Sequence, residues 1–152
     1  MSSNDYRQIR GYVNTRMAIV EPTFSEWTDS LAEIGNIPRT KLDRAYQVNI
    51  GAATSTTQID RHVSDLVNVV ISVFRQGFNN ATQTRDDLLQ VANCIRLDMI
   101  NPLNIEEYKR ANDGNIEDVI SVSITPSEIA ASNDNILKVE IELNLRLLIG
   151  TT

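Results

Sequence analysis

The chain has 152 residues, a hydrophobic content of 41% and a charged content of 22%, as expected for one globular domain spanning residues 1–152. Its net charge of −6 argues against sequence-independent binding of DNA or RNA, because such binding depends on Lys and Arg that neutralise phosphates. The sequence contains no apolar run near the ~18 residues of a membrane span and no signal-peptide pattern, so we expect neither membrane insertion nor export.

The first predicted element is an amphipathic helix from about Asn4 to Val20. Its apolar residues recur at spacings of three and four, which is the period of one helix face, and they are Tyr6, Ile9, Val13, Met17 and Val20. Pro22 ends this helix. The connector from Glu21 to Leu42 contains Phe24 and Trp27, so we expect an ordered excursion packed onto the domain rather than a free linker.

Two strands and a polar segment are predicted in the middle of the chain. The alternation of Tyr46, Val48 and Ile50 with polar residues predicts a strand of about five to eight residues. The segment from Gly51 to Gln58 is small, polar and uncharged, which fits either a mobile loop or the tips of a long hairpin. From Leu66 to Phe74 apolar residues occupy both faces, which predicts a central strand covered on two sides.

A second helix is predicted to end at Met99, because Asn101-Pro102 follows it. Thr84 and Asp87 have the spacing of a capping box at its start. Its buried stripe is expected to consist of Leu88, Val91, Ala92, Ile95 and Met99. The segment from Asn104 to Asn115 is polar and is expected to be a connection with a turn at Asp113-Gly114.

The last two predicted strands lie at 120–124 and 137–147, joined by a turn near Asn133. The final strand alternates apolar and polar residues over eleven positions, which corresponds to roughly 35 Å at ~3.3 Å per residue. Since strands of that length often extend to another subunit, it favours an assembly protein. The expected fold is α+β, with a mostly antiparallel sheet of about four long strands and two helices on one face, in the order helix-strand-strand-helix-strand-strand.

The residue types of common catalytic and metal sites are scarce. His62 is the only histidine and Cys94 the only cysteine, so the chain alone supplies too few ligands for a usual zinc site and cannot form an internal disulfide. A chain without disulfides is typical of a reducing compartment. Asp86-Asp87 and Glu106-Glu107 lack the ligand spacing of a calcium loop. We therefore expect no catalytic residue, no metal site and no cofactor, which makes an enzyme the least favoured class.

The order and texture of these elements resemble the tail terminator (tail completion) proteins of long-tailed bacteriophages. The resemblance is carried by the segments 5–20, 45–51, 81–99, 97–102, 120–125 and 137–149. The resemblance implies a non-enzymatic virion protein of the tail or neck, made in the host cytoplasm. It implies a homohexameric ring that caps the tail tube, stops its polymerisation and joins the tail to the head connector. Its partners would be the tail tube protein and a connector or neck protein, and DNA would pass through the lumen without specific binding.

A closed ring requires an interface between two different faces of the subunit. We expect the polar segment after the first strand, the turn before the last strand and the polar face of the last strand to contact a neighbour or the tube. The candidate contact residues are Thr54, Ser55, Thr56, Thr57, Gln58, Asn133, Asp134, Glu140, Glu142 and Arg146.

Two other functions stay open. One is a different phage neck or head–tail connector protein, which shares the class of function and differs in its partner. The other is a small-molecule-binding α+β domain, whose pocket would lie between the second helix and the sheet. A ring protein should bury its long strands between subunits, whereas a binding domain should be monomeric with one large apolar pocket.

Overall fold

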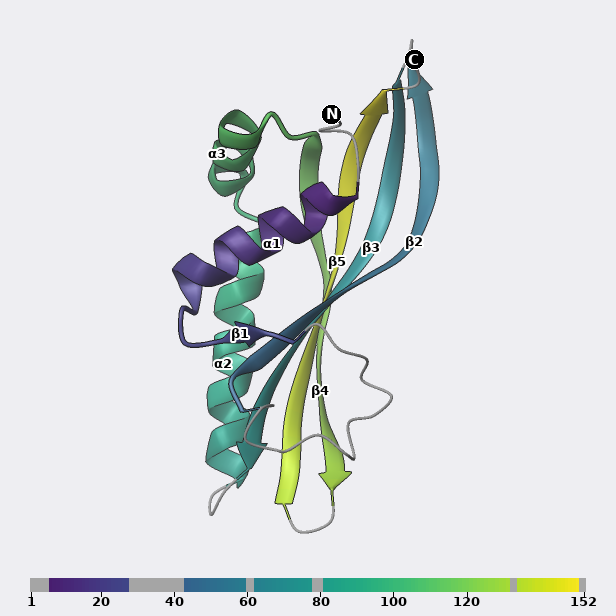
Figure 1. Ribbon diagram of the computed structural model, residues 1–152. Coiled ribbons are helices and arrows are strands. Elements are labelled where there is room, and N and C mark those ends of the chain that lie inside the picture. The colour runs from purple at the N-terminus through teal and green to yellow at the C-terminus, as the bar shows by residue number, and fades with distance from the viewer. Residues whose placement is uncertain (1–5, 28–42, 60–61, 78–80, 132–133, 151–152) are drawn as a thin grey trace.

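The computed structural model describes residues 6–27, 43–59, 62–77, 81–131 and 134–150 (Figure 1). The elements in chain order are α1 (Arg7–Val20), β1 (Ser25–Glu26), β2 (Ala45–Ile59), β3 (His62–Gly77), α2 (Ala81–Met99), α3 (Pro102–Asn112), β4 (Ile116–Ala131) and β5 (Asp134–Gly150). The strands form one sheet in the order β1-β2-β3-β5-β4. The helices lie together on one side of this strongly twisted sheet (Figure 1).

The α+β class is confirmed, and the details of the predicted sheet are corrected. The sheet is mixed rather than wholly antiparallel, because the short strand β1 pairs in parallel with Ala45 and Tyr46 at the start of β2. The other three strand pairs are antiparallel, as predicted. β1 belongs to the connector after α1, where Phe24 is buried and Trp27 half-buried. These two side chains therefore pack as expected, whereas residues 28–42 of that connector lie outside the described residues.

The two predicted helices are confirmed, because each has one apolar stripe of sufficient length. The predicted capping box is wrong, because α2 begins at Ala81 and Thr84 therefore lies inside the helix. Ile9, Val13 and Met17 of α1 are buried as predicted, whereas Tyr6 at its start is 39% exposed. In α2 the buried residues are Leu88, Ala92, Ile95 and Met99, each at most 1% exposed, while Val91 is half-buried. Both stripes enter the same hydrophobic cluster as the inner face of the sheet.

The structure adds a third helix, α3, where the sequence predicted a polar connection. Pro102, which ends α2, also occupies the first turn of α3, where its missing N–H is no loss. Asn101 caps this helix, since its side-chain oxygen accepts a hydrogen bond from the backbone N–H of Leu103 at 3.0 Å. Only Ile105 and Tyr108 of α3 are buried in the core. Two buried residues are too few to show a helical period, so the sequence pattern does not predict this helix.

The first two long strands extend well beyond their predicted lengths. β2 has 15 residues and β3 has 16, and they form one antiparallel hairpin. The segment 51–58 is part of β2, so the hairpin alternative holds and the mobile loop does not. Register shifts lie between Ile50 and Ala53 and between Ser55 and Thr57. The hairpin and the end of β5 project beyond the helices at the end of the sheet where the C-terminus lies (Figure 1).

The long strand β5 is central rather than an edge. It pairs with β3 from Asn135 to Gly150 and with β4 from Asp134 to Leu147. Its backbone groups are therefore satisfied within the chain. The length of β5 therefore does not by itself indicate a contact with another subunit, because its neighbours β3 and β4 have 16 residues each.

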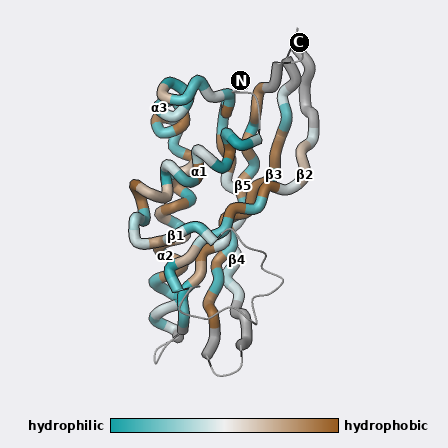
Figure 2. Tube along the Cα trace, in the orientation of Figure 1, coloured by the Kyte–Doolittle hydropathy of each residue, from teal (hydrophilic) through white to brown (hydrophobic). Residues whose placement is uncertain are grey.

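Hydrophobic and hydrophilic residues are interspersed along β3 and β5 (Figure 2), and their burial separates the two faces of the sheet. The inner face carries residues with at most 1% exposure, among them Val67, Val69, Ile71, Val73, Val139, Ile141, Leu143, Leu145 and Leu147. On the outer face of β3, Ser72 and Phe74 are also buried, whereas Leu66 and Val70 are half-buried. The prediction that β3 is covered on both faces is thus confirmed near Ser72 and Phe74 and holds only in part near Leu66 and Val70.

Candidate functional site

The outer face of the sheet carries three of the predicted contact residues, Glu140, Glu142 and Arg146, at alternate positions of β5. All three side chains are half-buried. The Asn68 amide donates a hydrogen bond to Glu142 Oε2 at 2.8 Å, and Arg146 Nε lies 3.5 Å from Asp118 Oδ2. Ladders of partly exposed polar pairs fit a surface that meets water or another protein rather than a core.

Strand pairing divides the predicted contact residues between two ends of the sheet. Thr54 is exposed and lies in one row across the sheet with Leu66, Arg146 and Asp118. Thr54 and Arg146 are therefore two strands apart, or about 10 Å. Asp134 begins β5 at the opposite end, twelve residues or about 40 Å from Arg146 along the strand. The structure thus brings Thr54 near Arg146 and does not bring either near Asp134.

Four of the candidates, Ser55, Thr56, Thr57 and Gln58, belong to the outer half of β2. Ser55, Thr57 and Gln58 pair with Asp65, Ser64 and Val63 of β3, and a register shift lies around Thr56. They are strand residues and not loop residues. Asn133 lies outside the described residues.

The sheet has two long edges that no other described strand covers. β1 pairs with β2 only at Ala45 and Tyr46, and β4 pairs only with β5. Two large apolar residues, Ile120 and Val122 of β4, are 48% and 47% exposed beside one of these edges. The alternation of Ile120, Val122 and Ile124 with serines is typical of a buried face, so the sequence pattern does not indicate these exposed positions. The register shift between Ser121 and Ser123 interrupts that alternation, and no sequence signal marks it.

A buried ion pair holds the three helices together. Arg16 of α1 donates from Nε and Nη2 to the two carboxylate oxygens of Asp98, each at 2.8 Å. The Asn104 amide of α3 donates to the same carboxylate at 3.1 Å. The hydrogen bonds to Asp98 raise the pKa of Arg16, so the guanidinium stays charged. With all its strong contacts inside the chain, this cluster positions helices.

Tyrosine hydroxyls bind α1 to the elements around it. Tyr12 donates to the carbonyl of Met99 at 2.6 Å, and its ring meets the Tyr108 ring edge-on with centroids 5.5 Å apart. Tyr46 of β2 donates to Asn14 Oδ1 at 2.9 Å. Burial raises the pKa of Tyr46 to about 12 and also raises the pKa of Tyr12. Both phenols are therefore neutral hydrogen-bond donors at ordinary pH.

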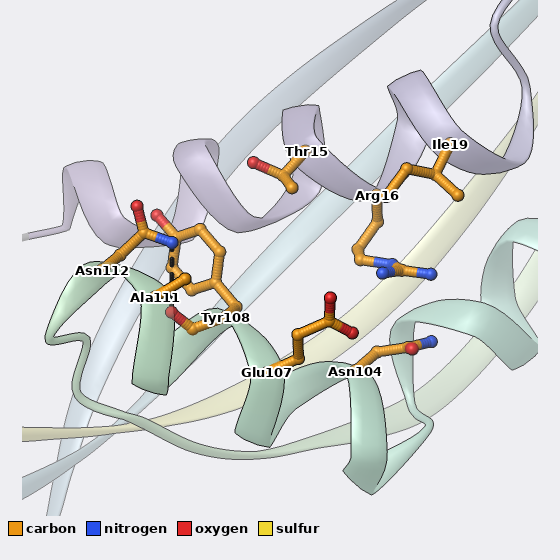
Figure 3. Close-up of a pocket in the computed structure, with 8 residues that line it drawn as sticks. All are labelled: Thr15, Arg16, Ile19, Asn104, Glu107, Tyr108, Ala111 and Asn112. Carbon is orange, nitrogen blue, oxygen red and sulfur yellow. Dashed lines mark hydrogen bonds between the residues drawn. The ribbon is translucent and has the colours of Figure 1, made fainter.

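A small pocket lies between α1 and α3 (Figure 3). It is lined by Thr15, Arg16, Ile19, Asn104, Glu107, Tyr108, Ala111 and Asn112. Its cavity volume of about 70 Å³ is far below the ~300–1,000 Å³ of typical ligand sites. The place expected for a ligand pocket, between α2 and the sheet, is filled by the α2 stripe and the inner face of β3 and β5. This packing argues against a small-molecule site there.

His62 and Cys94 lie on different elements, β3 and α2. His62 is the first residue of β3 at the hairpin end of the sheet. Cys94 is exposed on α2, where Gln90 contacts its Sγ at 3.7 Å. Within the described ranges, no three His, Cys, Asp or Glu side chains are grouped to hold a metal ion. None of the described helices is both long enough and apolar enough to cross a membrane.

No protein-family model matches this chain, and no curated protein is similar enough in sequence to count as a match. A functional proposal therefore rests on the residues and geometry of the chain itself. Those point to surfaces for contact, namely the outer face, the projecting hairpin and the two long edges of the sheet.

Proposed function

We propose that this chain is a non-enzymatic structural protein that forms a ring, and specifically a tail terminator of a long-tailed phage. Six copies would cap the tail tube, stop its polymerisation and present a surface to the head connector. The protein would belong to the tail or neck of the virion. The net charge of −6 supports a lumen through which DNA passes without binding.

The observation that carries the proposal is the pair of long sheet edges on opposite sides of one rigid core. A closed ring needs a heterologous contact, in which one face of a subunit meets a different face of the next. Free strand edges suit such a contact, because their backbone N–H and C=O groups can be satisfied across the boundary. The helices lie on one side of the sheet, and β2 and β4 are its long outer strands (Figure 1).

The first test is a mass measurement by light scattering, on the protein alone and then with polymerising tail tube protein encoded by the same genome. The expected result is a particle of about six chains, either free or formed only on tubes. Tube length, measured by electron microscopy, should become fixed when the protein is added. Tube protein polymerised with an unrelated acidic protein of similar size is the control.

Two results would contradict the proposal in different ways. A strict monomer that leaves tube growth unchanged would exclude a terminator. A ring that ignores tubes and binds the head connector would instead identify another neck protein. The two readouts, subunit number and tube length, therefore separate the terminator from the nearest competing function.

A further inference from the structure

The two edges of the sheet differ in how they are protected against pairing with another strand. Natural edge strands commonly carry prolines and charges that prevent such pairing. The stretch 49–59 of β2 has neither a proline nor a charged residue. Its exposed side chains include Asn49, Ala52, Ala53 and Thr54. The edge strand β4 contains Pro126, together with acidic residues near both of its ends.

The pairing register shows where each edge is closed. Tyr46 pairs with Val73, which pairs with Val139, which pairs with Pro126. The proline of β4 therefore lies at the same height across the sheet as the part of β2 that β1 already covers. Both edges are blocked at one level, on opposite sides of the sheet.

Above that level no other described strand pairs with either edge, and the two edges lie at equal heights. Asn49 shares a row with Ser123, and Thr54 shares a row with Asp118. The open part of β4 also holds the exposed apolar residues Ile120 and Val122. Small uncharged residues on one edge thus stand level with apolar residues on the other.

Strand directions fit a head-to-tail contact between these edges. Successive neighbours β2, β3, β5 and β4 are all antiparallel. A rotation about an axis roughly along the strands keeps both the height and the direction of every strand. It would therefore place β2 of the next copy antiparallel to β4, which continues the ladder.

Charge favours the same pairing. The segment from Pro102 to Ala131, which contains α3 and β4, carries six acidic and two basic residues. On the other side β2 carries no charge. Two of the three arginines of α1 are already paired within the chain, Arg16 with Asp98 at 2.8 Å and Arg10 with Glu26 at 2.6 Å. Arg10 also reaches the edge of β2, where its Nη2 donates to the carbonyl of Val48 at 3.2 Å, just before residues 49–54. A β2-to-β4 contact places the acidic β4 region beside an uncharged strand, whereas a β4-to-β4 contact would bring acidic residues together.

We infer that the occupant of the β4 edge is a second copy of this chain, with residues 49–54 of its β2 paired antiparallel to residues 118–123 of β4. The sheet then continues from one subunit to the next around the ring. The inference rests on the proposed ring and assigns its self-interface.

The test is cysteine crosslinking in a Cys94→Ser background. One variant combines Asn49→Cys with Ser123→Cys, and a second combines Thr54→Cys with Asp118→Cys, so that each pair is level in the inferred contact. The matched control combines Thr54→Cys with Ser127→Cys, which lies nine residues from Asp118, or about 30 Å along β4. Each variant is oxidised under the conditions in which light scattering shows the ring. A second sample is treated with a short crosslinker that reacts with two thiols. Both samples are then run on a denaturing gel without reductant.

The expected result is a ladder of covalent species up to the ring size in at least one level pair, with about tenfold less crosslinking in the control, because a disulfide needs Cβ atoms ~3.5–4.5 Å apart. A ring by light scattering without such a ladder would overturn the inferred interface and leave the proposed ring standing. Dimers from Asn49→Cys alone would also overturn it, since they indicate β2-to-β2 contact. A protein that forms no ring on any tube would remove both proposals. Circular dichroism checks that each variant folds.

Discussion

The two faces of the sheet use the same strands in opposite ways. On the inner face Val69, Ile71 and Ile141 are fully buried beneath the helices. On the outer face their neighbours Asn68 and Glu142 are half-buried and share a hydrogen bond of 2.8 Å. Hydrophobic burial on the inner face therefore stabilises the fold, while the outer face and the edges remain open to contacts.

The ion pairs repeat this contrast. Arg16 and Asp98, between helices, have side chains only 10% and 15% exposed, and their two contacts are 2.8 Å long. Arg146 and Asp118, on the outer face, are 40% and 48% exposed and 3.5 Å apart. The Arg16–Asp98 pair therefore stabilises the fold. The Arg146–Asp118 pair, which lies in the same row of the sheet as Thr54, is exposed enough to contact another molecule.

The largest effect is expected from Ile141→Ala on the inner face. Removing this fully buried side chain should lower the free energy of unfolding by about 4 kcal/mol, through lost burial and a cavity. The matched change at the exposed β4 edge, Val122→Ala, should change it by less than about 0.5 kcal/mol in the monomer. Urea unfolding measures both variants. Equal losses would contradict the prediction, because they would show that the inner face and the β4 edge contribute equally to stability.

The next effect is expected from Asp98→Ala, which leaves the Arg16 guanidinium buried without its partner. The loss should be about 3 kcal/mol. Asp118→Ala should cost under about 1 kcal/mol, because an exposed pair is screened by water. Thermal unfolding of the two variants gives the comparison, and a larger loss for Asp118→Ala would contradict it.

Alkaline pH should lower the free energy of unfolding through the buried tyrosines that contact α1. An unfolded tyrosine releases its proton near pH ~10, whereas burial raises the pKa of Tyr46 to about 12 in the folded protein. Between these values the folded state binds more protons, so stability is complete below pH ~10 and falls by about 1.4 kcal/mol per pH unit for each such tyrosine. Tyr46→Phe should flatten this slope. A slope unchanged by Tyr46→Phe would contradict the assignment.

The smallest effect is expected on the outer face. Asn68→Ala removes the hydrogen bonds to Glu142 and Asn144, at 2.8 Å and 3.3 Å, and should cost about 1 kcal/mol. Ser127→Ala, at an exposed position of β4, should be neutral within about 0.5 kcal/mol. Chemical unfolding distinguishes these values, and a loss for Asn68→Ala as large as that for Ile141→Ala would mean that the outer face is also a core.

Much of the fold follows from local pattern. The stripes of α1 and α2 and the alternation of β5 are long enough to indicate the type of each element. The polar positions Glu140, Glu142 and Arg146 were placed on one face by the period of two, and the structure confirms that placement. α3 and β1 were missed because two buried residues, or two strand residues, carry no measurable period.

The amino-acid sequence by itself determined which residues share a face of each helix and strand, because helical and strand periods are local properties of the chain. Only the tertiary structure decided that β5 is central, that β2 and β4 are the edges and that Thr54 stands level with Asp118. Strand order and register are set by backbone hydrogen bonds between residues distant in sequence. The surfaces on which the proposed ring depends are therefore properties of the assembled sheet.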